Sequence, residues 1–400
     1  MASSSTTRID LALTVMIVQH WDAKGQLNPV TRTKLLIGVA AILIAAVIGG
    51  ILLNQPSQQG DALRIGVLLP LTGEGASYGE DCRRGIELAL DNFRKRGAKP
   101  VEVVFEDTKI DPKTAISAFN KLVSVDKSQA IIGDMFSSTT LAVAPLAQQA
   151  SVVLLTPTAA DERIPATGDH VFSIYPSASS EGQFMAERLE IETLQRVAVL
   201  YQNQTATKGI ADAFADAVRK RGGSVAIVES IPDEKSSYRS LLERVAARRP
   251  SSIFISAYRD PVAMLITMGR ESGLNVPYVT QSTLYDEKAL VDYADKLEGV
   301  LLSGPYFDST SDAAAVKKFF ADYQARFGKP PSVWSAYGYD AADILLTALV
   351  EAANEKVSVG SKLAGRVFSG LTGRTDIKQD RSIEKEMVLY SIQGNTFVRR

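Results

Sequence analysis

The sequence is poor in the residues that most often hold metals or perform covalent catalysis. Its 400 residues include one cysteine, Cys82, and two histidines, His20 and His170. A single cysteine forms no intrachain disulfide and no cysteine-based metal site. With so few histidines, neither a zinc site nor a histidine-dependent triad is expected. We therefore predict no metal site and no histidine-dependent catalysis; we also expect no other catalytic residue and no cofactor.

The chain also lacks an excess of either charge. Lys and Arg number 44 and Asp and Glu number 45, so the net charge is −1. This balance gives no reason to expect a polyanionic partner, and we predict no nucleic-acid partner. Hydrophobic residues make up 46% of the chain, which is ordinary for a globular protein.

One stretch lacks charged residues altogether. Residues 35–53 read LLIGVAAILIAAVIGGILL, and as a helix they would span about 28 Å, close to the thickness of a membrane's hydrocarbon core. Basic residues precede this stretch and none follows until Arg64, so the positive-inside rule places residues 1–34 in the cytoplasm. A cleaved signal peptide is the alternative, but the run is longer than a typical signal-peptide core. We expect an uncleaved single-pass anchor in the inner membrane.

A polar linker, residues 54–62, leads into residues 63–400, where short apolar runs alternate with segments of helical spacing. Continuous apolar strands that alternate with helices are typical of parallel sheets covered on both faces. The expected strands exceed the number of a usual sheet, so two sheets and two lobes are predicted. The candidate strands are residues 64–70, 101–107, 130–135, 152–158, 172–177, 196–202, 224–230, 252–258, 278–283 and 299–305.

Several expected helices have clear local signals. Asp111 with Pro112, and Asp260 with Pro261, fit the N-cap and first position of a helix. Cys82 lies on the apolar stripe of the helix expected after the first strand, which predicts a buried core residue.

The glycine-rich loop after the first strand resembles a nucleotide-binding loop only in part. Gly73, Gly75 and Gly79 follow the pattern G-x-G-x-x-x-G, one residue longer than the dinucleotide fingerprint. The acids that end the next strand lie well beyond the usual offset of about 20 residues from the glycines. A nucleotide-dependent enzyme is therefore kept only as a second alternative.

Three loops follow the carboxyl ends of expected strands, where open α/β sheets bind ligands. They read PLTGEGASYGED (70–81), GDMFSSTT (133–140) and TPTAAD (156–161). The SSTT segment offers hydroxyl groups and backbone N–H groups at the start of a helix, which suit a carboxylate. Together with YGYDAADILLTAL and the closing FSGLTGRTDI, these motifs make residues 63–400 similar to the Leu/Ile/Val-binding branch of the type I periplasmic binding proteins.

The resemblance implies an α/β fold of two Rossmann-like lobes with parallel sheets, joined by a hinge in which the chain crosses three times. The crossings would fall near 175–179, near 304–309 and within 350–385. Lobe 1 would then comprise about 63–176 and 308–350, and lobe 2 about 178–306 and 351–400. A late hairpin is expected to turn at Gly394 and Asn395.

The resemblance also implies a ligand site between the lobes. In amino-acid-binding members the SSTT loop holds the ligand carboxylate, an aromatic residue lies over the ligand, and a lobe 2 tyrosine contacts it. The matching positions here are Tyr78, Ser137, Ser138, Thr139, Thr158, Ala159 and Tyr258. Helix capping by Ser137 or Ser138, and an exposed loop position for Tyr78, are the structural alternatives.

Three positions depart from the family pattern. Ala160 stands where a threonine donor is usual, and Ala206 stands where a tyrosine is usual. Ser282 stands where a carboxylate pairs with the ligand ammonium, and a buried ammonium without a counter-charge is costly. Gln204 is a candidate donor in lobe 2. Three loop acids are candidates for a substitute counter-charge, although capping or solvent exposure explains each as well: Asp161, Asp260 and Asp286.

The resemblance implies an extracytoplasmic solute-binding protein that captures an amino acid, an amide or a small carboxylate by hinge closure. Its partners would be that small-molecule ligand, an ABC permease or another membrane protein, and the membrane through its own helix. A membrane-anchored sensor that acts through a partner protein is the first alternative.

Overall fold

The structure, a computed structural model, describes residues 33, 62–97, 99–307 and 311–400. Residues 62–400 form one compact unit. The expected membrane segment, residues 35–53, lies outside the described residues. Within the described part of the chain, no helix is both long enough and apolar enough to cross a membrane.

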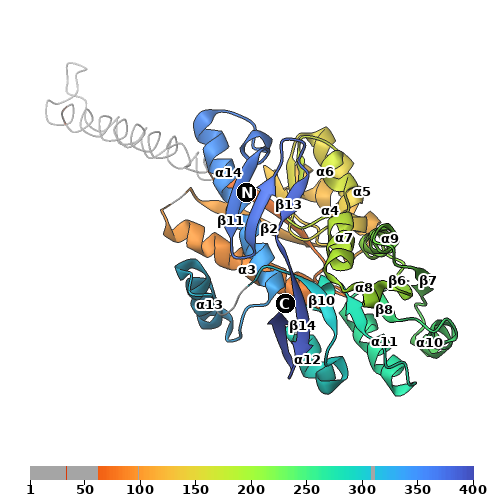
Figure 1. Cartoon of the computed structure of the whole chain (residues 1–400). Coiled ribbons are helices and arrows are strands. Elements are labelled where there is room, and N and C mark those ends of the chain that lie inside the picture. Colours follow the sequence, from red (N-terminus) through yellow and green to blue (C-terminus); the bar gives the residue numbers. More distant parts are fainter. Residues whose placement is uncertain (1–32, 34–61, 98, 308–310) are drawn as a thin grey trace, which may run out of the picture. The chain divides into compact units, whose positions relative to one another are not determined.

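Lobe 1 is built on a five-stranded parallel sheet (Figure 1). In spatial order its strands are β2 (Val101–Asp107), β1 (Leu63–Leu69), β3 (Ala130–Ile132), β4 (Val153–Thr156) and β5 (Val171–Ser173). The helices of this lobe are α3 (Ala76–Lys95), α4 (Pro112–Ser124), α5 (Ser137–Ala150), α6 (Arg163–Ala166), α13 (Ala314–Phe327) and α14 (Val333–Glu355).

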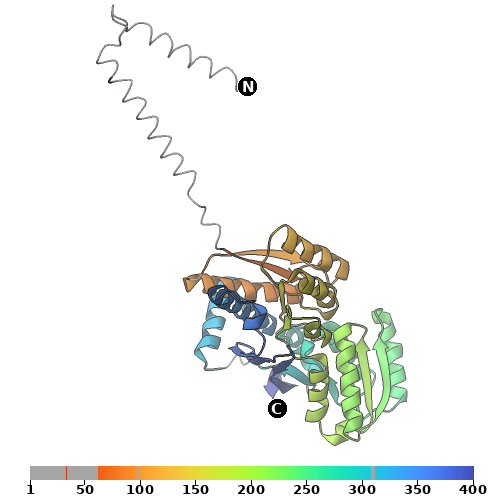
Figure 2. The same cartoon turned by 90° about the horizontal axis from the view of Figure 1, so that it is seen from above.

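Lobe 2 is built on a mixed seven-stranded sheet. Its parallel part contains β7 (Val225–Ile231), β6 (Val197–Gln202), β8 (Ser252–Ser256), β9 (Tyr278–Thr280) and β10 (Leu301–Pro305). Its helices are α7 (Ala178–Arg188), α8 (Ile191–Leu194), α9 (Thr205–Lys220), α10 (Tyr238–Ala247), α11 (Arg259–Glu271) and α12 (Glu287–Tyr293). Figure 2 shows the orange-to-yellow elements of lobe 1 and the green elements of lobe 2 as two separate groups.

The C-terminal segment divides between the lobes differently from the expected division. Strands β11 (Arg366–Gly370), β12 (Gly373–Ile377) and β13 (Ile383–Lys385) form a separate antiparallel sheet. This sheet is held on lobe 1, because Asp340 of α14 accepts hydrogen bonds from the N–H groups of Leu371 and Thr372, both at 2.8 Å. Residues 351–385 therefore lie with lobe 1, whereas the resemblance placed them in lobe 2.

Only the last hairpin joins lobe 2. Strands β14 (Met387–Gln393) and β15 (Thr396–Arg399) add antiparallel to β10, as Figure 1 shows for β14. Gly394 and Asn395 form the turn with positive φ angles of 53° and 59°, in the region that favours glycine and asparagine. The expected turn is confirmed, and the third crossing lies between β13 and β14.

The local signals at the helix starts are confirmed in part. Asp111 is the N-cap of α4, and its side chain accepts a hydrogen bond from the Thr114 N–H at 2.8 Å. The same prediction for Asp260 is wrong, because α11 starts at Arg259 and Tyr258 is its N-cap. Asp260 instead lies in the first turn and accepts a hydrogen bond from Arg259 Nε at 2.8 Å. Cys82 is fully buried on α3, as predicted.

Candidate ligand-binding site

A cavity of about 60 Å³ lies between the lobes, at the carboxyl ends of strands of both sheets. Both lobes contribute to its wall. Of the residues that the sequence singled out, the cavity brings together Tyr78, Ser137, Thr158, Ala160, Ala206, Tyr258 and Ser282. Ser138, Thr139, Ala159 and Gln204 lie outside its wall.

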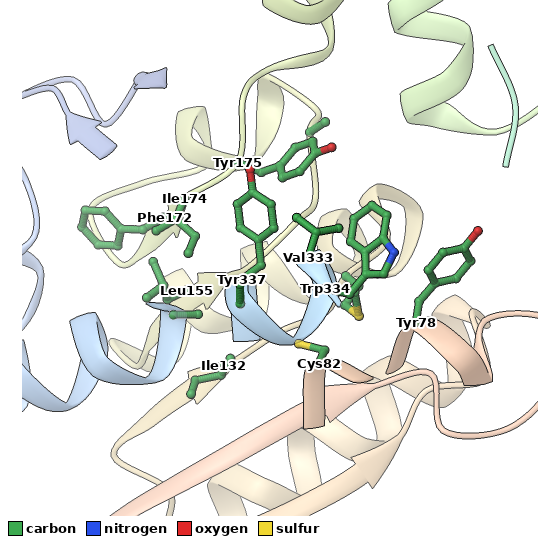
Figure 3. Close-up of a cluster of buried hydrophobic side chains, with 14 of the residues drawn as sticks. Tyr78, Cys82, Ile132, Leu155, Phe172, Ile174, Tyr175, Val333, Trp334 and Tyr337 are labelled. Carbon is green, nitrogen blue, oxygen red and sulfur yellow. The ribbon is translucent and has the colours of Figure 1, made fainter. Parts of the chain in front are cut away.

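Aromatic side chains form much of the cavity wall. The rings of Tyr78 and Trp334 meet edge to face with centroids 5.4 Å apart, and Figure 3 shows them side by side. Phe136 of lobe 1 meets Tyr258 of lobe 2 in the same way, with centroids 5.2 Å apart. This contact connects the lobes across the site. Such a wall favours a ligand with an apolar or aromatic body.

The start of helix α5 presents hydrogen-bond donors to the cavity. The Ser137 Oγ accepts a hydrogen bond from the Ala160 N–H at 3.1 Å, so the Ser137 hydroxyl proton is free to point elsewhere. Neither serine caps the helix, because Phe136 is its N-cap and no side chain caps it. The Thr139 hydroxyl is turned inward and donates to the Phe136 carbonyl at 3.0 Å. Of the SSTT segment, only Ser137 therefore faces the cavity.

A buried carboxylate holds the loop that leads into α5. Asp134 accepts hydrogen bonds from the Thr108 hydroxyl and from the N–H groups of Met135 and Phe136. Burial raises the pKa of Asp134 to about 6, while these hydrogen bonds lower it. The interactions fix the backbone that carries Phe136 and Ser137 to the cavity.

Only part of the TPTAAD loop lines the cavity. The Thr158 hydroxyl lines the cavity and donates to the Met135 carbonyl at 3.0 Å. Ala159 lies behind the wall, where its N–H donates to the Thr156 hydroxyl at 3.0 Å. Ala160 lines the cavity without a side-chain donor, as its type implies.

The lobe 2 wall contains a tyrosine, Tyr258, whose hydroxyl makes no hydrogen bond within the described part of the chain. Burial raises the pKa of Tyr258 and of Tyr78, so both phenols stay protonated and able to donate. Gln204 lies instead beside two neighbouring hollows near the mouth of the cleft.

The loop acids suggested as substitute counter-charges are already paired. Asp161 forms an ion pair with Arg163 at 2.8 Å. Asp260 and Asp286 both pair with Arg259, at 2.8 and 2.7 Å. The Arg259 guanidinium in turn lies over the Tyr78 ring, 5.8 Å from its centroid. Of these contacts, only that of Arg259 with Tyr78 joins the two lobes, and it lies at the mouth of the cleft.

The carboxylate that does line the cavity comes from a residue that sequence reasoning missed. Glu181 lies on α7, directly after the first crossing, and is 1% exposed. Its Oε1 accepts hydrogen bonds from the Ser282 N–H at 2.8 Å and from the Ser303 hydroxyl at 2.5 Å. The Ser282 hydroxyl is hydrogen-bonded to the Tyr175 hydroxyl at 2.6 Å. In the sequence, an acid in the first turn of a helix is typical of dipole stabilisation, so nothing pointed to a ligand contact.

Comparison with known proteins agrees with this arrangement of two lobes and a cleft. The family model described as periplasmic binding protein matches residues 62–396. The chain therefore belongs to the periplasmic binding protein family, and the family prediction is confirmed.

Individual relatives are similar to this chain over most of their length. The chain is 24% identical over 328 residues to the leucine-, isoleucine-, valine-, threonine- and alanine-binding protein of Pseudomonas aeruginosa, covering 79% of this chain and 86% of that protein. A leucine-binding protein from Thermotoga maritima matches with a TM-score of 0.77 at 23% identity, over 84% of this chain and 97% of that one. A solute-binding protein of an ABC transporter from R. palustris, in complex with 4-hydroxybenzoate, matches with a TM-score of 0.78 at 21% identity, over 85% and 96%.

Proposed function

We propose that this chain is an extracytoplasmic solute-binding protein that captures a small organic acid or amino acid between its two lobes and delivers it to an ABC-type importer. The step is binding without covalent chemistry. The ligand would lie against Tyr78, Phe136, Tyr258 and Trp334, with an acceptor group on the donors around Ser137. Hinge closure would stabilise the complex, because the closed state makes contacts that the open state lacks.

The observation that carries this proposal is a cavity whose wall comes from both lobes. A ligand in this cavity would contact both lobes, which meet beside it through Phe136 and Tyr258. The relatives support the ligand class, since one is named for binding leucine, isoleucine, valine, threonine and alanine, and another is in complex with 4-hydroxybenzoate. An anchor formed by residues 35–53 would keep the binding domain beside its membrane partner.

A thermal-shift panel tests the proposal on residues 62–400. The panel contains L-amino acids, amides, small aromatic and aliphatic carboxylates, and nucleotides. We expect a saturable rise in Tm with a member of the first three classes, since a ligand at 100 times its Kd adds about 2.7 kcal/mol to the free energy of unfolding. A rise with nucleotides alone would contradict the proposal.

Tyr258→Phe makes the panel specific for the site. Since the Tyr258 hydroxyl has no partner among the described residues, its loss leaves the Tm without ligand nearly unchanged. We expect the ligand-induced rise in Tm to shrink, because a donor to the ligand is lost. Tyr293→Phe, on α12 of the same lobe and outside the cavity wall, is the matched control and should behave as the unchanged chain. An equal loss in both variants would place the ligand elsewhere.

A further inference from the structure

Glu181 is a buried acid in the wall of the cavity. It is 1% exposed, and it forms no ion pair with any Lys or Arg that the structure describes. Both of its hydrogen bonds, from Ser282 and Ser303, are made to Oε1 and come from neutral donors. The second oxygen, Oε2, has no hydrogen-bond partner among the described residues, while the side chain lines the cavity.

Such an arrangement is unfavourable in the empty site and favourable in an occupied one. A carboxylate removed from water is costly unless it is paired and hydrogen-bonded. The other acids near the cleft, Asp260 and Asp286, have Arg259 as their partner, which leaves Glu181 as the carboxylate of the cavity wall with an oxygen to spare. A positively charged group of the ligand would therefore supply the partner of the Glu181 carboxylate.

We infer that Glu181 selects a ligand that carries a protonated nitrogen. This inference rests on the proposed function. It adds that the ligand carries an amine, which distinguishes it from small acids without nitrogen. In the family pattern, the acid that binds the ligand ammonium stands at the position of Ser282. In this chain Ser282 carries no charge, and its N–H donates to the Glu181 carboxylate. The charge thus reaches the cavity from α7 rather than from the loop after β9. A ligand with an amine at Glu181 and an acceptor at Ser137 would contact both lobes at once.

The test compares pairs of compounds with the same carbon skeleton, with and without the amino group. The probes are L-leucine with 4-methylpentanoate, and L-phenylalanine with 3-phenylpropanoate, titrated calorimetrically into the full-length chain. Glu181→Gln removes the charge but keeps an oxygen that can accept from Ser282 and Ser303. Glu187→Gln, an exposed acid on the same helix, is the matched control.

We expect each amine to bind more tightly than the matching compound without the amino group. Glu181→Gln should raise the Kd of the amines by roughly 10- to 100-fold, the usual range for a hydrogen bond to a charged group. The Tm of this variant without ligand should stay equal or rise, because an unpaired buried charge is removed. Glu187→Gln should change neither quantity.

Two results would overturn the inference in different ways. If the compounds without nitrogen bind as tightly as the amines, and Glu181→Gln leaves all affinities unchanged, the inference is wrong while the proposed function stands. If neither set binds and the thermal-shift panel is also silent, the proposed function fails and the inference fails with it. A fall in the Tm of Glu181→Gln without ligand, with unchanged affinities, would assign Glu181 a structural role.

Discussion

At the scale of single residues, the most unusual charge outside the cavity is Lys385, at the third crossing. Its Nζ donates to the hydroxyls of Thr372 and Thr375 at 2.8 and 2.7 Å. The Thr372 hydroxyl in turn donates to Asp340 at 2.6 Å, so a threonine connects the lysine to the acid. Burial lowers the pKa of Lys385 to about 8, although Asp340 raises it.

This lowered pKa predicts a pH dependence of stability. Between pH 8 and the ordinary lysine pKa, the unfolded chain holds a proton that the folded chain has lost. The free energy of unfolding therefore gains up to about 1.4 kcal/mol per pH unit from Lys385 as the pH rises. Urea unfolding at pH 7, 8, 9 and 9.5 measures this slope.

Lys385→Met supplies the comparison, because every other titrating group is common to both chains. The difference in free energy of unfolding between the unchanged chain and the variant should grow in favour of the unchanged chain above pH 8. Parallel curves over the whole range would show that Lys385 titrates normally.

The sequence predicted those residues of the candidate site that follow the carboxyl end of a strand. Tyr78 and Ser137 lie in the first turns of the helices that follow β1 and β3, and Thr158 lies in the loop after β4. Segments that follow the carboxyl ends of parallel strands meet at the same edge of a sheet. Glu181 and Trp334 were missed because each lies on a helix that follows a crossing between the lobes or another helix, where periodicity predicts only a buried or exposed face. Their place in the cavity depends on the crossings, which no local pattern specifies.

At the scale of elements, lobe 1 depends on the close contact of α3 with α14. A Cβ added at Gly85 of α3 would lie 1.9 Å from the carbonyl oxygen of Ser335 on α14. Backbone cannot yield as a flexible side chain does, so the helices approach this closely only with glycine at that position. The contact bears on the candidate site because Trp334, which lines the cavity, precedes Ser335 in the first turn of α14.

Gly85→Ala should therefore lower the free energy of unfolding by about 3 kcal/mol, at the upper end of overpacking effects. The measurement is urea unfolding of residues 62–400. Gly209→Ala on α9 is the control, since its new Cβ would meet only the Ala178 Cβ at 3.2 Å. That variant should stay within about 1 kcal/mol of the unchanged chain, helped by the better helix propensity of alanine. Equal effects of the two substitutions would contradict the role of the close contact.

The sequence predicted the strands of the two large sheets but not those of the small antiparallel sheet. The strands of the two large sheets lie in mainly apolar runs, and every expected run overlaps an observed strand. Strands β11 to β13 were missed because glycine and polar residues interrupt them, so no apolar run marks them. Asp340 is what holds this sheet on lobe 1, and a contact between residues so distant in sequence leaves no local signal.

At the scale of the whole binding unit, residues 62–400, the two lobes meet through contacts that only a closed cleft permits. Phe136 contacts Tyr258 beside the cavity, and Arg259 lies over Tyr78 at its mouth. Trp334 lines the cavity between them, and its indole N–H has no hydrogen-bond partner among the described residues. Figure 3 shows the indole nitrogen on the side that faces Tyr78. A bound ligand would therefore change the surroundings of this indole directly.

The most direct test of ligand capture between the lobes is the fluorescence of Trp334 during ligand titration. The chain has two tryptophans, and Trp21→Phe leaves Trp334 as the only one. We predict that the ligand found by calorimetry produces a saturable change in Trp334 emission, with one site and the same Kd. A ligand that binds with a measurable heat and leaves the Trp334 emission unchanged would contradict the claim that the cavity between the lobes is the binding site.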